Sequence, residues 1–241
     1  MEKITQAVRE AIAPTGHLRV AINYGNPVIA QQGEDGTPQG VSADLAYAFA
    51  KRLDLPIRFV PFNAAGKVVA ALDEEAWDLA FLARDPLRGE KIKFSSPYVI
   101  IEGTYLVPNT SVFTQVDELD RDGVRIAVGE GAAYDLFLTR SLTQAELVRA
   151  STSSGAVDLF VERGLNAAAG VRQPLERYAE SHLDYRVLPG HFTVIEQAMA
   201  MPRGRKSVAA YMDDFITEMK RSGFVAKALA NSQQTDAKVT P

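Results

Sequence analysis

The stretch WDLAFLARDPLRGEKIKFSSPYVI, residues 77–100, decides the fold class. Its mostly apolar beginning, residues 78–82, has the length and composition of a strand buried inside a sheet. A polar loop with Pro86 and Arg88 follows, and an extended apolar stretch then runs from Tyr98 to Val107. Open α/β sheets bind ligands just beyond the carboxyl ends of their strands. Arg88 leaves such an end and is therefore the first candidate for a ligand contact.

Strand and helix patterns alternate on the N-terminal side of this stretch. An opening helix that includes Ile4 and Ile12 is expected first, and Ser42 is the expected N-cap of a later helix. Further predicted elements are strands at 18–22 and 57–62 and a short helix at 65–72. Parallel strands need a crossover between them, so this β-α-β-α-β order favours a parallel α/β sheet.

The same alternation returns after residue 120. Strands are predicted at 124–128, 146–148 and 166–169, and helices from about 132, at 156–162 and at 171–180. The segment STSSG, 151–155, is typical of a helix cap. Two more helices are expected at 207–221 and 224–230, and the polar last ten residues are expected to fray.

Two extended apolar stretches, 98–107 and 194–201, connect the two alternating halves. They predict two α/β lobes joined by two hinge strands, with residues 1–102 and 197–241 in lobe 1 and 103–196 in lobe 2. Rotation of the lobes is expected to pivot on Ile101–Thr104 and Val194–Gln197. A single continuous sheet with both segments as central strands would contradict this pivot.

Composition excludes several classes of protein. The chain has 241 residues, of which 46% are hydrophobic and 23% charged, as in ordinary globular proteins. No apolar run approaches the ~18 to 20 residues that a membrane span needs, and 26 basic against 30 acidic residues give no basic surplus for nucleic acid. Without cysteine, disulfides and zinc–thiolate sites are impossible. His17, His182 and His191 lack metal-ligand spacing, so no metal or cofactor is expected.

In sequence, the chain resembles the type 2 periplasmic solute-binding proteins of bacterial ABC importers, in particular the polar-amino-acid-binding subfamily. The resemblance runs from about Leu18 to Ala230. It is carried, in order, by LRVAINYGNPV, GVSADLAYAFAKRL, the stretch 77–100, GVRIAVGEGAAYDLFL and AMAMPRG. It implies two Rossmann-like lobes that close over a small solute by hinge motion, for which periplasmic binding proteins are a standard example.

The resemblance also implies a ligand site. Arg88 fills the position at which the family clamps the ligand carboxylate, and a guanidinium fork suits that group. Gly131, Ala132 and Ala133 begin a helix whose N–H groups could hold an anion, although Ala132 replaces the family's hydroxyl. Further expected contacts are Tyr24, Asn26, Phe62, Lys67, Ala83 and Asp85.

The largest departure from the family lies at Val171. Amino-acid binders carry an aspartate there, which pairs with the ammonium of the ligand, and an unpaired buried charge is costly. Arg172, the next residue, is a hydrogen-bond donor. A carboxylate without an amino group, or a ligand with two acidic groups, is therefore favoured over a standard amino acid.

Three functions are consistent with this site. The first is a non-catalytic, monomeric binding protein that delivers a small carboxylate to an ABC permease. The second is an enzyme on the same scaffold with dehydratase-like chemistry, for which Glu130 and Glu196 are the candidate acids or bases. The third is a ligand sensor in the cytoplasm. The N-terminus does not have the pattern of a signal peptide. A periplasmic location is expected if the chain is a trimmed mature form, and a cytoplasmic one if Met1 is native.

Overall fold

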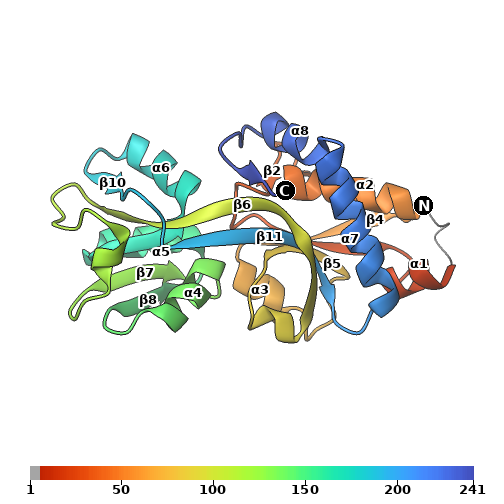
Figure 1. Ribbon diagram of the computed structural model, residues 1–241, viewed down its shortest axis with the longest axis horizontal. Coiled ribbons are helices and arrows are strands. Elements are labelled where there is room, and N and C mark those ends of the chain that lie inside the picture. The colour runs from red at the N-terminus through yellow and green to blue at the C-terminus, as the bar shows by residue number, and fades with distance from the viewer. Residues whose placement is uncertain (1–5) are drawn as a thin grey trace. The chain divides into compact units, whose positions relative to one another are not determined.

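The computed structural model describes residues 6–241, apart from the side chains of Lys206 and Ser207. The chain divides into two compact units (Figure 1). Unit 1 contains the described residues up to Asn63, together with Lys67–Ile100 and Glu196–Pro241. Unit 2 contains Ala64–Gly66 and Ile101–Ile195. The borders on the crossing strands are thus 100/101 and 195/196, where the sequence places them at 102/103 and 196/197.

Unit 1 has the elements of an α/β sandwich. Its helices are α1 (Gln6–Ile12), α2 (Val41–Leu53), α7 (Lys206–Arg221) and α8 (Phe224–Asn231), together with α3 (Ala65–Ala70) from residue 67 on and a 3₁₀ turn at Arg88–Glu90. Its strands are β1 (Leu18–Asn23), β2 (Gln31–Gln32), β3 (Pro38–Gln39), β4 (Ile57–Phe62), β5 (Leu79–Ala83) and β12 (Lys238–Val239). β4, β1 and β5 pair in parallel, and β11 (Thr193–Pro202) pairs antiparallel with β5.

Unit 2 repeats the pattern. Its helices are α4 (Ala133–Ser141), α5 (Ser153–Arg163) and α6 (Arg172–Ser181), with a 3₁₀ turn at Val116–Leu119. Its strands are β7 (Arg125–Gly129), β8 (Glu146–Ala150), β9 (Ala167–Val171) and β10 (Tyr185–Val187). β8, β7 and β9 are parallel, and the long strand β6 (Ile92–Pro108) runs antiparallel to β9.

The strand and helix predictions are confirmed to within a few residues, but the cap of α2 is wrong. Gly40, at φ 93°, is the N-cap, and it makes no side-chain cap bond. Ser42 lies inside the helix, fully buried, and its hydroxyl contacts the Tyr98 hydroxyl at 3.2 Å. The predicted cap at 151–155 is correct, since the Thr152 Oγ1 accepts a bond from the Gly155 N–H. Ile4, from the predicted opening helix, lies outside the described residues.

The strand order also corrects the pivot prediction. Hydrogen bonding joins the strands in the order β4-β1-β5-β11-β6-β9-β7-β8 without a break. The predicted pivots, Ile101–Thr104 in β6 and Val194–Gln197 in β11, are therefore parts of the two central strands of one path. Because the sheet is continuous and both segments are central strands of it, the pivot prediction is wrong. The physical reason is that both crossings are long strands: β6 pairs with β12 in unit 1 and with β9 in unit 2, and β11 pairs with β5 in unit 1.

The C-terminal tail is ordered by pairing, so the predicted fraying is also wrong. Lys238 and Val239 form β12 and pair with Ile100 and Val99 of β6. The Thr240 N–H donates to the Tyr98 carbonyl at 3.2 Å, and the Lys220 ammonium donates to the Pro241 carbonyl at 2.6 Å. Backbone pairing stabilises the tail, and the polar side chains on which the fraying prediction was based do not oppose that pairing.

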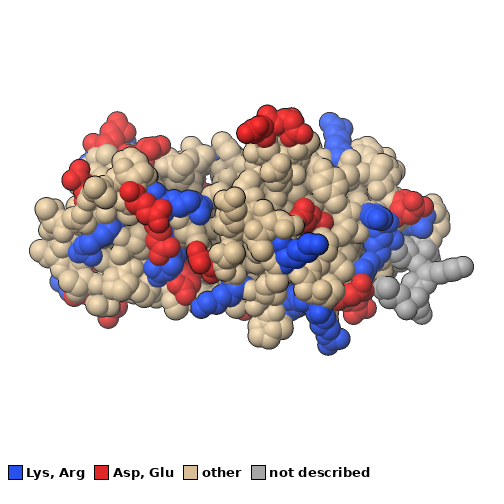
Figure 2. Space-filling model, turned by 90° about the horizontal axis from the view of Figure 1, so that it is seen from above, with Lys and Arg blue, Asp and Glu red and all other residues tan. Residues whose placement is uncertain are grey.

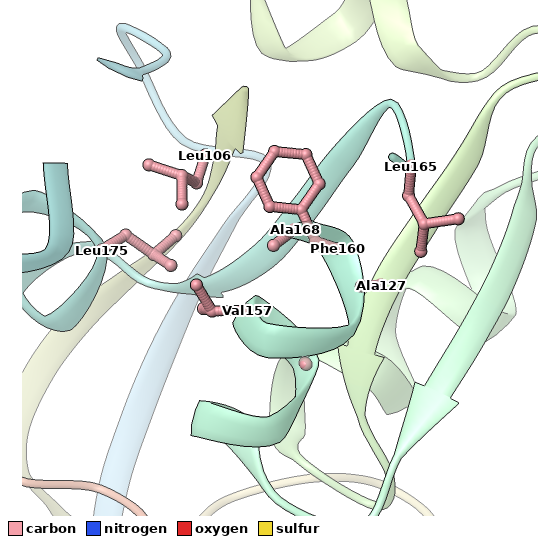
Figure 3. Packing of buried hydrophobic residues seen from close by; sticks show 8 residues of the cluster. Leu106, Ala127, Val157, Phe160, Leu165, Ala168 and Leu175 are labelled. Carbon is pink, nitrogen blue, oxygen red and sulfur yellow. The ribbon is translucent and has the colours of Figure 1, made fainter. Parts of the chain in front are cut away.

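The core of unit 2 shows why these elements pack together (Figure 3). Phe160 and Val157 of α5 and Leu175 of α6 lie against Leu106 of β6 and Ala168 of β9. Small alanines on the strands allow the larger helix side chains to approach the sheet closely. This packing fixes the strand ends at which the second half of the predicted site lies.

Candidate ligand-binding edges

The strands β1, β4 and β5 of unit 1 end at one edge of its sheet, at Asn23, Phe62 and Ala83. Loops that follow these ends carry most of the predicted contacts of unit 1. Four of the polar side chains that the structure describes as buried lie at or just beyond this edge: Asn23, Asp85, Arg88 and Gln197. Because buried polar groups are uncommon away from functional sites or structural networks, this edge is the candidate ligand-binding edge of unit 1.

Arg88 is buried, with 3% of its surface exposed. Its Nη1 donates to the Ala83 carbonyl at 2.9 Å, which ties the guanidinium to the end of β5. Burial lowers the pKa of Arg88 to about 10, an effect that the charge of Asp85 opposes. The side chain thus remains a cation at neutral pH, held in a poorly solvated place. Arg88 is therefore a buried arginine and not a solvated surface residue.

Asp85 builds the loop that presents Arg88. Its Oδ1 accepts hydrogen bonds from the N–H groups of Leu87 at 2.9 Å and of Arg88 at 3.4 Å. Its backbone carbonyl accepts a bond from the Gly89 N–H at 2.9 Å. A buried carboxylate with these bonds fixes the turn, and the predicted direct contact of Asp85 with a ligand stays a prediction.

The loop after β1 is organised by two asparagines. The Asn23 Oδ1 accepts a bond from the Gly25 N–H at 3.0 Å, and the Asn26 Oδ1 accepts one from the Val28 N–H at 3.3 Å. Tyr24 and Phe62 are half-buried, and burial raises the pKa of the Tyr24 hydroxyl. Lys67 is exposed, and its ammonium donates to the Asn63 Oδ1 at 2.9 Å. The structure thus brings Tyr24, Asn26 and Phe62 to the same edge as Arg88.

Glu196, a candidate acid or base, forms a half-exposed ion pair with Arg84 at 3.0 Å. Together with Asp85 these residues line an open groove of about 460 Å³ in unit 1. Glu130, the other candidate, is exposed in unit 2. Neither has the buried environment that tunes a catalytic carboxylic acid.

Unit 2 has a corresponding edge, at which β7, β8 and β9 end at Gly129, Ala150 and Val171. In the turn after β7, the carboxylate of Asp135 accepts a hydrogen bond from the backbone. The Gly131 N–H donates to the Asp135 Oδ2 at 2.8 Å, and the Ala132 N–H donates to the Gly129 carbonyl at 3.1 Å. These two amides therefore have acceptors within the protein, and contact of Gly131, Ala132 or Ala133 with a ligand stays a prediction.

Asp135 is the residue that the sequence analysis missed at this turn. It is buried in the first turn of α4, where a carboxylate suits the helix dipole, and it pairs with Arg149 at 3.0 Å. The motif GxxxD at 131–135, in which the acid lies four residues after the glycine, is the signal that could have indicated it.

Arg172 is held in an ion-pair network, in which its guanidinium donates to acceptors within the protein. Its Nε pairs with Glu102 at 2.8 Å, its Nη1 with Glu176 at 3.3 Å, and its Nη2 bonds to the Gly190 carbonyl. The His191 Nδ1 lies 3.5 Å from the same Glu102. Val171 precedes this network as the half-buried last residue of β9. Arg172 thus has three acceptors within the protein, and contact of Arg172 or Val171 with a ligand stays a prediction.

The described residues 6–241 contain neither a cluster of metal ligands nor a long apolar helix. No group of three or more histidine, aspartate or glutamate side chains there could hold a metal ion. Within the same residues, no helix is both long and apolar enough to cross a membrane. On the face shown in Figure 2, basic and acidic side chains are interspersed, so this face carries no extended field of one sign.

Comparison with known proteins identifies the family. The model of the bacterial extracellular solute-binding proteins, family 3, matches residues 18–231. The chain belongs to this family. The predicted fold, with two α/β lobes of the type 2 periplasmic-binding class, is thereby confirmed, and so is the prediction of a solute-binding protein rather than an enzyme.

Three relatives illustrate the match. The L-cystine-binding protein TcyJ of Escherichia coli K12 is 24% identical over 218 residues, which cover 86% of this chain and 79% of TcyJ. The cysteine-binding protein of Campylobacter jejuni superposes with a TM-score of 0.79 at 21% identity and covers 93% of this chain and 92% of its own. The ancestral amino-acid-binding protein AncCDT-1, a precursor of cyclohexadienyl dehydratase, gives 0.76 at 23% identity and covers 92% and 98%. At these identities the superpositions show the shared fold.

Proposed function

We propose that this protein captures a small carboxylate-bearing metabolite on the periplasmic side and delivers it to an ABC-type permease. Membership of the solute-binding family supports capture and delivery. The observation that carries the carboxylate is Arg88, a buried cation fixed at the carboxyl end of β5. A cation in a poorly solvated place gains most from a charge-assisted, bidentate bond to an anion.

The ligand in this proposal is not a standard α-amino acid. An α-ammonium group needs a buried counter-charge, and Val171 stands where the family supplies one. Near the same edge of unit 2, Asp135 and Glu102 are each paired with an arginine. Each carboxylate already has an arginine as its counter-charge, so an ammonium would gain less from it than from an unpaired acid.

Arg88→Ala tests the carboxylate clamp. Native mass spectrometry of protein purified without added solute first identifies a retained metabolite, and calorimetric titration then measures its affinity. We expect Arg88→Ala to weaken binding by roughly 2 to 5 kcal/mol, because the charge-assisted bonds are lost and the anion stays buried without its counter-charge. Arg88→Lys should recover only part of the loss, because an ammonium lacks the guanidinium fork.

Lys91→Ala is the matched control, since Lys91 lies three residues away in an exposed ion pair with Asp73. Such a pair contributes about 0 to 1 kcal/mol, so this variant should bind and fold like the wild type. An Arg88→Ala protein that binds within about threefold of wild type would remove Arg88 from the site. Because Arg88 is buried and bonded to Ala83, its removal should also lower stability by roughly 1 to 3 kcal/mol.

A further inference from the structure

Gln197 lies buried in β11, with 3% of its surface exposed, in a stretch of otherwise mostly apolar residues. Its Oε1 is buried and accepts no hydrogen bond from any of the residues 6–241 that the structure describes. Buried side-chain acceptors are nearly always satisfied in folded proteins, because an unpaired one has lost its water without compensation. This oxygen therefore requires an explanation.

The strand register places Gln197 at the candidate edge of unit 1. Gln197 is the direct neighbour of Ala83 across the antiparallel pair of β11 and β5, so both side chains stand on the same face of the sheet. The Ala83 carbonyl is the acceptor of the Arg88 guanidinium. The unpaired amide oxygen and the proposed carboxylate clamp thus belong to adjacent positions at one strand end.

Its polar neighbours at this edge have evident local roles. The Asn23 Oδ1 holds the Gly25 N–H, and the Asp85 Oδ1 holds the N–H groups of its own loop. Glu196, the preceding residue of β11, points to the other face and pairs with Arg84. No such local role accounts for Gln197.

We propose that Gln197 is a specificity-determining residue, whose Oε1 accepts a hydrogen bond from a neutral hydroxyl or amide group of the bound carboxylate. The inference rests on the proposed function and narrows its ligand to hydroxy acids or amide-bearing acids. A neutral donor fits better than an ammonium, because a carbonyl oxygen supplies no full counter-charge to a buried cation.

Matched pairs of carboxylates test the inference without any mutation. Malate differs from succinate, and lactate from propionate, by one hydroxyl. The dissociation constants of all four for the wild-type protein are measured by calorimetry. We expect the hydroxylated member of at least one pair to bind about tenfold more tightly, since an oxygen left unpaired by the other member discriminates strongly.

Gln197→Met then removes the amide at nearly constant volume. The variant should bind both members of the pair within threefold, and without added carboxylate its melting temperature should equal or exceed that of the wild type, because no unpaired oxygen is buried. A lower melting temperature with the tenfold preference retained would show a purely structural role and overturn the inference. Gln39→Met, at an exposed glutamine of unit 1, is the control and should keep the wild-type preference.

The two proposals fail differently. If at least one pair binds and the members of every pair that binds differ by less than threefold on the wild type, the role of Gln197 is overturned and the carboxylate function stands. If none of the four acids binds, and no carboxylate metabolite is found by native mass spectrometry, the proposed function is overturned together with this inference. Should Gln197→Met not fold, the wild-type pairs still decide.

Discussion

At the scale of single residues, the buried carboxylate of Asp78 pairs with two arginines of unit 1, Arg19 and Arg205. Its carboxylate accepts bonds from the Arg19 backbone and guanidinium and lies 3.1 Å from Arg205, which also bonds to the Ile12 carbonyl at the end of α1. The hydrogen bond to the Asp78 carboxylate raises the pKa of Arg19. Asp78→Ala should lower the free energy of unfolding by roughly 1 to 3 kcal/mol, because it leaves two half-buried arginines without their buried carboxylate. Urea denaturation measures this, with Asp73→Ala, in an exposed pair with Lys91, as a control that should cost under about 1 kcal/mol.

Asp120 gives a residue-scale prediction of pH dependence. Its carboxylate accepts bonds from the N–H groups of Thr143, Gln144 and Ala145, and the bonds to these amides, led by Gln144, lower its pKa to about 2. A folded-state pKa below the unfolded value means that the stabilisation is complete above about pH 4 and is lost as the pH falls toward 2. Asp120→Asn should therefore be less stable than wild type at pH 7, with a deficit that shrinks between pH 4 and pH 2.

A series of denaturation curves from pH 7 to pH 2.5 checks this window. Asp122→Asn, at an exposed residue two positions later, should follow the wild type throughout. A deficit for Asp120→Asn that stays constant down to pH 2.5 would mean that the carboxylate charge is not what stabilises this turn.

At the scale of elements, β12 shows how a short strand can fix a chain end. Thr240 donates its N–H to the Tyr98 carbonyl, and Thr240→Pro removes this donor together with the hydroxyl. We expect a loss of about 1 to 2 kcal/mol and faster amide exchange at Val99 and Ile100, which pair with β12. Thr235→Pro, in the exposed turn before β12, is the control. Unchanged exchange in Thr240→Pro would show that the tail does not protect β6.

The elements also show how far sequence reasoning extends. Periodicity predicted the helices and parallel strands because each helix buries one face, whereas residues 79–83 and 167–170 form apolar runs that are buried on both faces. It could not predict β12, because backbone pairing of a polar two-residue strand leaves no side-chain pattern. Nor could it predict the unpaired oxygen of Gln197, which depends on what the fold places around one side chain. Arg88 was predicted from its place after a strand end and from family resemblance, whereas its burial required the structure.

At the scale of the whole molecule, the division into two compact units agrees with membership of the solute-binding family. A solute that binds only the folded protein raises its free energy of unfolding, so binding can be measured as a gain in stability. A ligand present at 1,000 times its dissociation constant adds about 4 kcal/mol to the free energy of unfolding. In a thermal-shift panel, we expect L-cystine, L-cysteine and L-arginine to stabilise the protein less than carboxylates that lack an α-ammonium. The reason is that Val171 offers no counter-charge for the ammonium, and the nearby carboxylates of Glu102 and Asp135 are already paired with arginines. Val171→Asp provides the converse measurement, since it restores a carboxylate at the half-buried end of β9 and should improve the response to α-amino acids relative to wild type. An amino acid among the strongest stabilisers of the wild-type protein would show that the ammonium finds its counter-charge elsewhere and would refute the non-amino ligand.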